Sequence, residues 1–150
     1  MGNLTYSING TEVTKQVTRE SLVLDDYRGN YTIGAHWLAT ACNSQAGDGD
    51  TAGPMNLVVN QNGSSMSMNW TLPSGAVCTY SGPYTQNGEL GAFSANYSCS
   101  NGDVGPLEMF EMTNRVGMIS ARVSGQSTNL GCTYSGYFSG VDPSLPAQLN

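Results

Sequence analysis

The methionines and the single histidine offer the most distinctive chemistry in this chain. The stretch SMSMNWTL at 65–72 places two methionines two residues apart, followed by a tryptophan. Thioether sulfur suits Cu(I), so Met66 and Met68 could form a soft-metal site if a histidine joined them. In a regular strand, however, residues two apart share a face, which puts His36 opposite Trp37 and toward solvent. We therefore interpret the methionines as core residues and predict no metal site.

Acidic residues gather in two glycine-rich segments that precede a Gly-Pro pair. AGDGDTAGP at 46–54 contains Asp48 and Asp50, and SNGDVGP at 100–106 contains Asp103. Hard oxygen ligands in a flexible loop can bind calcium, but EF-hand spacing is absent. We predict that these residues form turns instead.

Hydrolytic chemistry lacks its usual residues. A serine or cysteine nucleophile needs a neighbouring base, yet His36 is the only histidine and no Gly-x-Ser-x-Gly motif occurs. The adjacent carboxylates Asp25 and Asp26 point to opposite sides of an extended chain, which separates them as an acid–base pair. We predict that the protein is not an enzyme and needs no cofactor.

Composition narrows the classes of partner. The 150 residues include 11 acidic and five basic side chains, and the formal net charge is −6. The basic residues are scattered, so no basic stripe could follow a nucleic-acid backbone. No apolar run of about 18 residues occurs, so we expect no transmembrane helix.

The four cysteines are even in number and include no Cys-x-x-Cys pair. Zinc ligands usually come as close pairs, whereas this pattern is typical of disulfides in an oxidising compartment. We expect the protein to be secreted, periplasmic or at the cell surface. The cysteines are Cys42, Cys78, Cys99 and Cys132.

The pentapeptide CTYSG occurs twice, at 78–82 and at 132–136. Each copy ends a unit that contains a strand ending in Cys, a loop ending in Gly-Pro, and a hairpin, which indicates internal duplication. Two four-stranded units predict an all-β, antiparallel, up-and-down eight-stranded barrel, with a sandwich of two four-stranded sheets as the alternative. We expect an N-terminal hairpin and linker over 1–27, the barrel over 28–141 and a tail over 142–150.

Apolar and polar residues alternate along the predicted strands, so each strand has one face for the interior. Hairpin turns are predicted at Asn9-Gly10, Asn62-Gly63 and Asn87-Gly88. The interior is expected to be either a solid core or a small cavity. The candidate ligand-binding residues are Trp37, Met66, Met68, Trp70, Tyr80, Phe93, Tyr97 and Tyr134.

All four cysteines are predicted to lie near one rim of the barrel. The turn at Asn87-Gly88 puts Cys78 nearly opposite Cys99, and closure of the barrel would bring the other two together. This favours Cys78–Cys99 with Cys42–Cys132. The pairing Cys42–Cys78 with Cys99–Cys132 stays open.

Two segments carry a resemblance to known proteins. NLTYSINGTEVTKQVTR at 3–19 and GAVCTYSGPYTQNGELG at 75–91 resemble parts of uncharacterised secreted proteins and lipoproteins of Gram-negative bacteria, the second segment their C-terminal part. The resemblance implies that the hairpin ends a preceding β-rich region and exposes a strand edge. GAHWL at 34–38 is similar to the Gly-x-Trp opening strand of calycins (lipocalins and avidins), with an extra residue before Trp37. SMSMNW with His36-Trp37 resembles small periplasmic copper-binding barrels.

Three functional hypotheses follow. The first is a non-enzymatic exported barrel that binds a small apolar or amphipathic ligand in its interior. The second is a self-assembling surface or filament subunit, in which residues 3–19 add strands to another copy. The third is a periplasmic Cu(I)-binding barrel.

Overall fold

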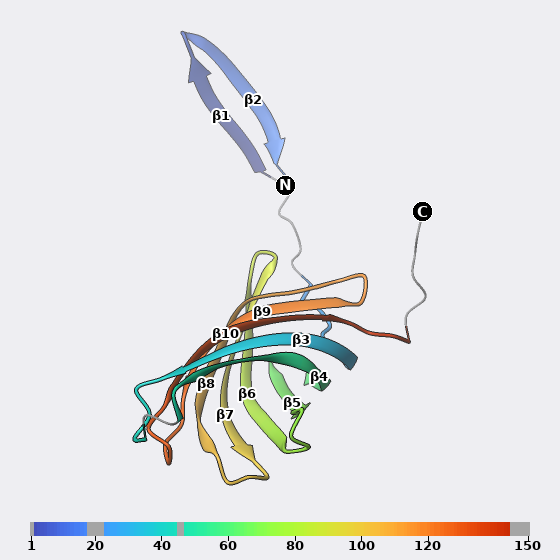
Figure 1. Ribbon diagram of the computed structural model, residues 1–150. Coiled ribbons are helices and arrows are strands. Elements are labelled where there is room, and N and C mark those ends of the chain that lie inside the picture. Colours follow the sequence, from blue (N-terminus) through green and yellow to red (C-terminus); the bar gives the residue numbers. More distant parts are fainter. Residues whose placement is uncertain (1, 18–22, 45–46, 145–150) are drawn as a thin grey trace.

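The chain is all-β in a computed structural model that describes residues 2–17, 23–44 and 47–144 (Figure 1). Its strands are β1 (Gly2–Ile8), β2 (Thr11–Val17), β3 (Gly29–Thr40), β4 (Gly49–Asn62), β5 (Ser65–Thr71), β6 (Val77–Asn87), β7 (Leu90–Cys99), β8 (Val104–Arg115), β9 (Met118–Gln126) and β10 (Thr133–Val141). Among the described residues there is no helix long and apolar enough to cross a membrane.

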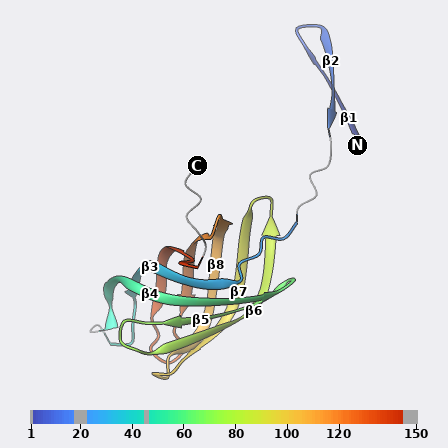
Figure 2. The same cartoon turned by 90° about the vertical axis from the view of Figure 1, so that its right-hand side faces the viewer.

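Strands β3 to β10 form one closed antiparallel barrel (Figure 2). Each strand pairs with the next along the chain, and β10 returns to pair with β3 from Thr133↔Thr40 to Val141↔Thr32. The eight-stranded up-and-down barrel and the separate N-terminal hairpin are therefore confirmed, and the sandwich is excluded. The two sequence repeats correspond to β3–β6 and β7–β10, which are the two halves of the barrel.

Tight turns with left-handed backbone connect the two strands of each hairpin. Gly63 and Gly88 have φ values of 58° and 64°, in the turns predicted from the Asn-Gly pairs. The β8–β9 turn uses Val116 and Gly117, both with positive φ (52° and 74°), and joins the paired residues Arg115 and Met118. Sequence reasoning missed this turn because valine rarely adopts that conformation.

Close contact between neighbouring strands explains why the repeated pentapeptide ends in glycine. A Cβ atom on Gly82 would lie 1.9 Å from the Ser94 carbonyl oxygen, and one on Gly136 would lie 2.2 Å from that of His36. Neighbouring strands therefore approach too closely at both positions for any other residue. The final Gly of CTYSG is required in both repeats for the same reason.

The end of the barrel opposite the disulfides is closed by the segment that leads into β3. Tyr27 is fully buried, and its hydroxyl donates to the Met112 carbonyl at 2.9 Å. Its ring meets Tyr84 edge-on, with centroids 5.3 Å apart, and its backbone N–H donates to Gln61 at 2.9 Å. Tyr27 is therefore part of the barrel core, although the sequence analysis placed it in the linker.

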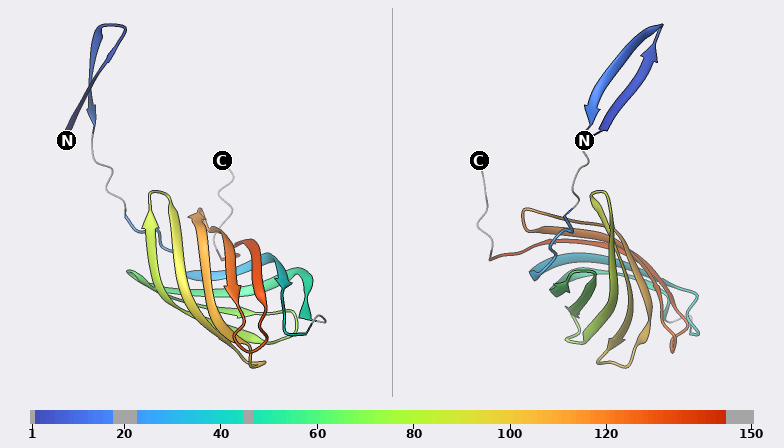
Figure 3. Two further views of the ribbon diagram at one scale, coloured as in Figure 1. Left: turned by 90° about the vertical axis from the view of Figure 1, so that its left-hand side faces the viewer. Right: turned by 180° about the vertical axis from the view of Figure 1, so that it is seen from behind.

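The N-terminal hairpin forms a two-stranded sheet of its own (Figure 3). Its register pairs Tyr6 with Val13, so these residues share one face with Leu4 and Ile8. The side chains of Leu4 and Ile8 are 51% and 56% exposed. The hairpin is thus amphipathic, with an apolar face that the described residues leave uncovered.

Candidate ligand-binding site

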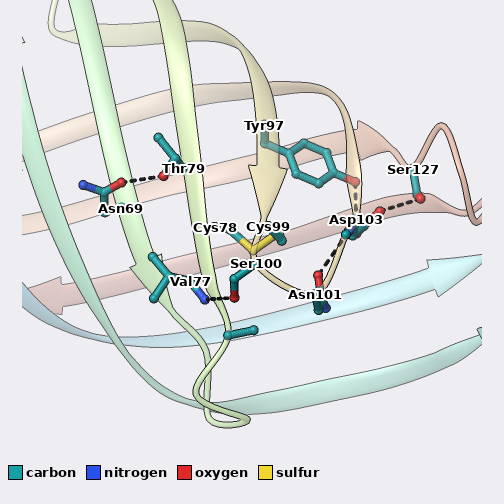
Figure 4. Close-up of a disulfide and its surroundings, with 12 residues drawn as sticks. Asn69, Val77, Cys78, Thr79, Tyr97, Cys99, Ser100, Asn101, Asp103 and Ser127 are labelled. Carbon is teal, nitrogen blue, oxygen red and sulfur yellow. Dashed lines mark hydrogen bonds between the residues drawn. A yellow bond between two sulfur atoms is a disulfide. The ribbon is translucent and has the colours of Figure 1, made fainter.

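Two disulfides tie together one end of the barrel. The bonds are Cys42–Cys132 and Cys78–Cys99, which confirms the favoured pairing and excludes the alternative. Figure 4 shows the Cys78–Cys99 bond. Cys78 and Cys99 are direct partners in the β6–β7 register. The two disulfides are consistent with an oxidising, extracytoplasmic location.

The other disulfide needs a local irregularity. The pairing Thr133↔Thr40 would place Cys132 opposite Ala41, one residue before Cys42. Ala41 adopts a left-handed conformation (φ 56°) just after β3. This extra residue turns the chain so that Cys42, and not Ala41, meets Cys132.

A cavity of about 490 Å³, partly open to solvent, lies at this disulfide-bearing end. Strands of both repeats and the loops between them contribute to its wall. Because Tyr27 closes the opposite end, this cavity offers the way into the barrel interior. The cavity is lined by Trp37, Thr51, Met55, Leu72, Pro73, Ser74, Cys78, Tyr80, Tyr97, Cys99, Asn101, Asp103, Leu107, Leu130 and Tyr134.

The predicted site residues fall into two groups. Half of them line the cavity: Trp37, Tyr80, Tyr97 and Tyr134. The others are core residues that do not line it: Met66, Met68, Trp70 and Phe93, each no more than 3% exposed. The interior is therefore solid core over much of its length and hollow at the disulfide end.

Aromatic rings connect the cavity wall to this core. The ring of the buried Trp70 lies 5.1 Å from Trp37 and 5.5 Å from Tyr80, measured between centroids. Tyr80 in turn lies 5.6 Å from Tyr97, and Phe138 meets Trp70 edge-on at 4.9 Å. A ligand in the cavity would contact Trp37 and Tyr80, which pack directly against Trp70.

Asp103 brings a carboxylate into the cavity wall. The Tyr97 hydroxyl lies 3.2 Å from its Oδ2, and Ser127 Oγ donates to its Oδ1 at 2.6 Å (Figure 4). The Tyr134 hydroxyl also lies 3.2 Å from Oδ2. Its backbone N–H donates to Asn101 Oδ1 at 3.2 Å, which fixes the turn after β7. Asp103 thus forms the turn that its sequence context predicts, and it also places a carboxylate in the cavity wall, which the sequence analysis did not predict.

Burial governs the acidity of the tyrosines around this carboxylate. It raises the pKa of Tyr80, of Tyr97 and of Tyr134, and the negative charge of Asp103 raises each pKa further. All three hydroxyls are therefore protonated at neutral pH and available as hydrogen-bond donors.

The Tyr80 hydroxyl differs from the other two. The hydroxyls of Tyr97 and Tyr134 donate to Asp103. The Tyr80 hydroxyl makes no hydrogen bond to any residue of the described chain, and none affects its pKa. The Tyr80 side chain is only 5% exposed and lines the cavity. Among the described residues, the fully buried side-chain polar atoms without a partner are Trp70 Nε1 and Asn114 Oδ1. The Tyr80 hydroxyl therefore keeps access to the cavity and is free to bind water or a ligand there.

The other residues considered for metal chemistry lie apart from the cavity. His36 Nε2 is 2.6 Å from Asp50 Oδ1 and its ring stacks on Tyr137, outside the barrel, so it does not meet Met66 or Met68. Asp48 accepts a hydrogen bond from the Cys42 backbone N–H at 2.9 Å, as expected of a turn residue. Among the described residues, no group of three or more His, Cys, Asp or Glu side chains is arranged to hold a metal ion.

No protein-family model, curated protein sequence or solved structure matches this chain. The resemblances to Gram-negative secreted proteins and to calycins therefore stay predictions. The cavity and the N-terminal hairpin are the two features of the described chain that bear on its function.

Proposed function

We propose that this protein is a non-enzymatic exported module that binds a small amphipathic molecule in the cavity at the disulfide end of the barrel. The observation that carries the proposal is the cavity itself. Its volume of about 490 Å³ falls within the roughly 300–1,000 Å³ that is usual for small-molecule sites.

The chemistry of the lining supports an amphipathic ligand. Met55, Leu72 and Leu107 offer apolar surface, while Asp103 and the Tyr80 hydroxyl offer polar contacts. Mostly apolar walls with a few fixed polar groups are typical of sites that bury a ligand and orient it. The two disulfides support a secreted, periplasmic or surface location, where the oxidised protein would meet such a ligand.

Native mass spectrometry of the oxidised full-length protein, purified from its exporting host, tests this proposal. We expect a bound small molecule that dissociates on activation. Thr51→Trp would fill the cavity with an indole ring and abolish the adduct. Thr32→Trp, on the outer face of β3, is the matched control and should retain it. A bare mass for the unmodified protein, with no ligand recovered by extraction, would count against a carrier.

The N-terminal hairpin favours a second candidate function, self-assembly. Hairpins of two strands are marginally stable by themselves, and this one exposes Leu4 and Ile8 on its apolar face. Within the described part of the chain, no third strand pairs with β1 or β2. Addition of this hairpin to a second copy would cover the apolar face and satisfy the strand edges.

Light scattering across a range of protein concentrations tests this second candidate. We expect concentration-dependent oligomers that the double substitution Leu4→Lys with Ile8→Lys abolishes. The matched control places lysines on the polar face, as Thr5→Lys with Ser7→Lys, and should leave assembly intact. If deletion of residues 1–20 leaves the oligomeric state unchanged, the hairpin is not the assembly element.

A further inference from the structure

We infer that the ligand of this cavity is an organic cation, a protonated primary or secondary amine that carries an apolar group. The inference rests on the proposed function, because it names the ligand class for the same site. It depends on three features of the lining: its charge, its aromatic walls and the Tyr80 hydroxyl, which faces the cavity without a hydrogen-bond partner among the described residues.

The charge of the lining is negative. Asp103 is its acidic residue, and the lining includes no lysine, arginine or histidine. Among the described residues Asp103 has no ion-pair partner, whereas the arginines Arg28, Arg115 and Arg122 pair with carboxylates elsewhere. A partly buried carboxylate without a counter-charge favours a cationic ligand over a neutral or anionic one.

Asp103 is also held in position for such a ligand. Hydroxyls of Ser127, Tyr97 and Tyr134 approach its two oxygens. A carboxylate has about four acceptor positions, so one position is left for a ligand N–H. The surrounding hydroxyls are weak neutral donors, and an ammonium would add a charge-assisted hydrogen bond.

The walls suit a cation as well. Trp37, Tyr80, Tyr97 and Tyr134 all line the cavity, and the faces of such rings attract ammonium groups. The Tyr80 oxygen can accept a second ammonium N–H beside the one that Asp103 accepts, and tertiary and quaternary ammonium ions lack two N–H groups. This hydroxyl therefore favours a primary or secondary amine.

The two repeats contribute different groups to the cavity, so one side of it is charged and the other is not. The two CTYSG copies supply Tyr80 and Tyr134 to the same cavity. Counting back from the Gly-Pro pairs, Asp103 of the second repeat corresponds to Thr51 of the first, and both line the cavity. Only the second repeat contributes a charge, so the ammonium group is expected beside β8 and the apolar tail toward Met55 and Leu72.

Three size-matched probes test the inference: hexylammonium, 1-hexanol and hexanoate, titrated into the oxidised full-length protein and followed by amide chemical shifts. We expect hexylammonium to bind about tenfold more tightly than 1-hexanol, and hexanoate to bind least. Asp103→Asn should weaken hexylammonium about tenfold without changing the affinity for 1-hexanol. Glu12→Gln makes the same change in net charge on the hairpin and should change neither affinity.

The outcomes separate the inference from the proposed function. If 1-hexanol binds as tightly as hexylammonium and Asp103→Asn changes neither, the cavity binds neutral molecules and the cation inference is wrong, while the carrier function stands. If none of the probes shifts the cavity amides and native mass spectrometry finds no adduct, both are wrong. Should Asp103→Asn fail to fold, salt decides with the unmodified protein: hexylammonium affinity that does not fall between 20 and 300 mM salt would overturn the inference.

Discussion

The buried tyrosines couple the stability of this barrel to alkaline pH. Burial is the main cause that raises the pKa of Tyr27 at the closed end and of Tyr80 and Tyr97 at the cavity. A tyrosine in the unfolded chain ionises near pH 10. The folded protein therefore keeps protons that the unfolded chain loses above that pH.

We expect the contribution of these tyrosines to the free energy of unfolding to stay constant below about pH 10 and to fall as pH rises further. Above that pH the unfolded state binds fewer protons than the folded state does. Urea unfolding at several pH values between 9 and 11.5, with tyrosinate absorbance recorded in parallel, measures the effect. Tyr80→Phe removes one of the ionising groups. Above pH 10 the slope of unfolding free energy against pH should therefore be smaller in the variant than in the unmodified protein, by about 1.4 kcal/mol per pH unit. An identical slope in the variant would show that Tyr80 ionises normally in the folded protein.

At the scale of the element, the β8–β9 turn is built from an ill-suited residue. Val116 has a positive φ of 52° and is 78% exposed, so no packing compensates for its backbone strain. Val116→Asn would create the Asn-Gly pair that this turn type prefers. We expect it to stabilise the protein by about 1 kcal/mol, measured by urea unfolding. Val58→Asn, on the outer face of β4, is the control. It should not raise the free energy of unfolding, because asparagine is a poor strand former.

The strand glycines allow a second prediction at this scale. Gly136→Ala would press a methyl group against the His36 carbonyl oxygen, 2.2 Å away, whereas a methyl group on Gly34 of the adjacent strand would meet nothing within 4 Å. We expect Gly136→Ala to destabilise the protein by at least about 2 kcal/mol and Gly34→Ala to be close to neutral. Thermal unfolding of the two variants checks this, and equal midpoints would mean that β3 and β10 separate easily.

The same elements show why some features were predictable and others were not. Alternation and duplication are carried by many residues at once, so they predicted the barrel and favoured the observed disulfide pairing, which only the structure distinguishes from its alternative. Asp103 and Val116 depend on one side chain or one backbone conformation, which no periodic pattern records. Tyr27 lies in a segment without strand pattern, and its contacts with Gln61, Tyr84 and Met112, all distant in sequence, place it in the core.

Across the whole molecule, the two repeats are joined in the same way at both of their seams. Cys78–Cys99 links the last strand of the first repeat to the first strand of the second, and Cys42–Cys132 links the remaining pair of terminal strands. Each disulfide therefore crosses a boundary between repeats at the open end, while Tyr27 closes the other end. The cavity lies where the halves are covalently fastened.

The two disulfides should nevertheless contribute differently. Cys42–Cys132 spans 90 residues of sequence and Cys78–Cys99 only 21, and a longer closed loop restricts the unfolded chain more. We expect Cys42→Ala with Cys132→Ala to destabilise the barrel by about 1 kcal/mol more than Cys78→Ala with Cys99→Ala. The midpoints of urea unfolding for the two variants measure this difference.

Ligand affinity should show the opposite order. Cys78 and Cys99 line the cavity, whereas Cys42 and Cys132 are not among the lining residues. Removal of Cys78–Cys99 should therefore weaken hexylammonium binding, and removal of Cys42–Cys132 should lower stability while leaving the affinity of the folded fraction unchanged. Equal loss of affinity in both variants would mean that the seam between β3 and β10 sets the shape of the cavity as strongly as the seam between β6 and β7 does.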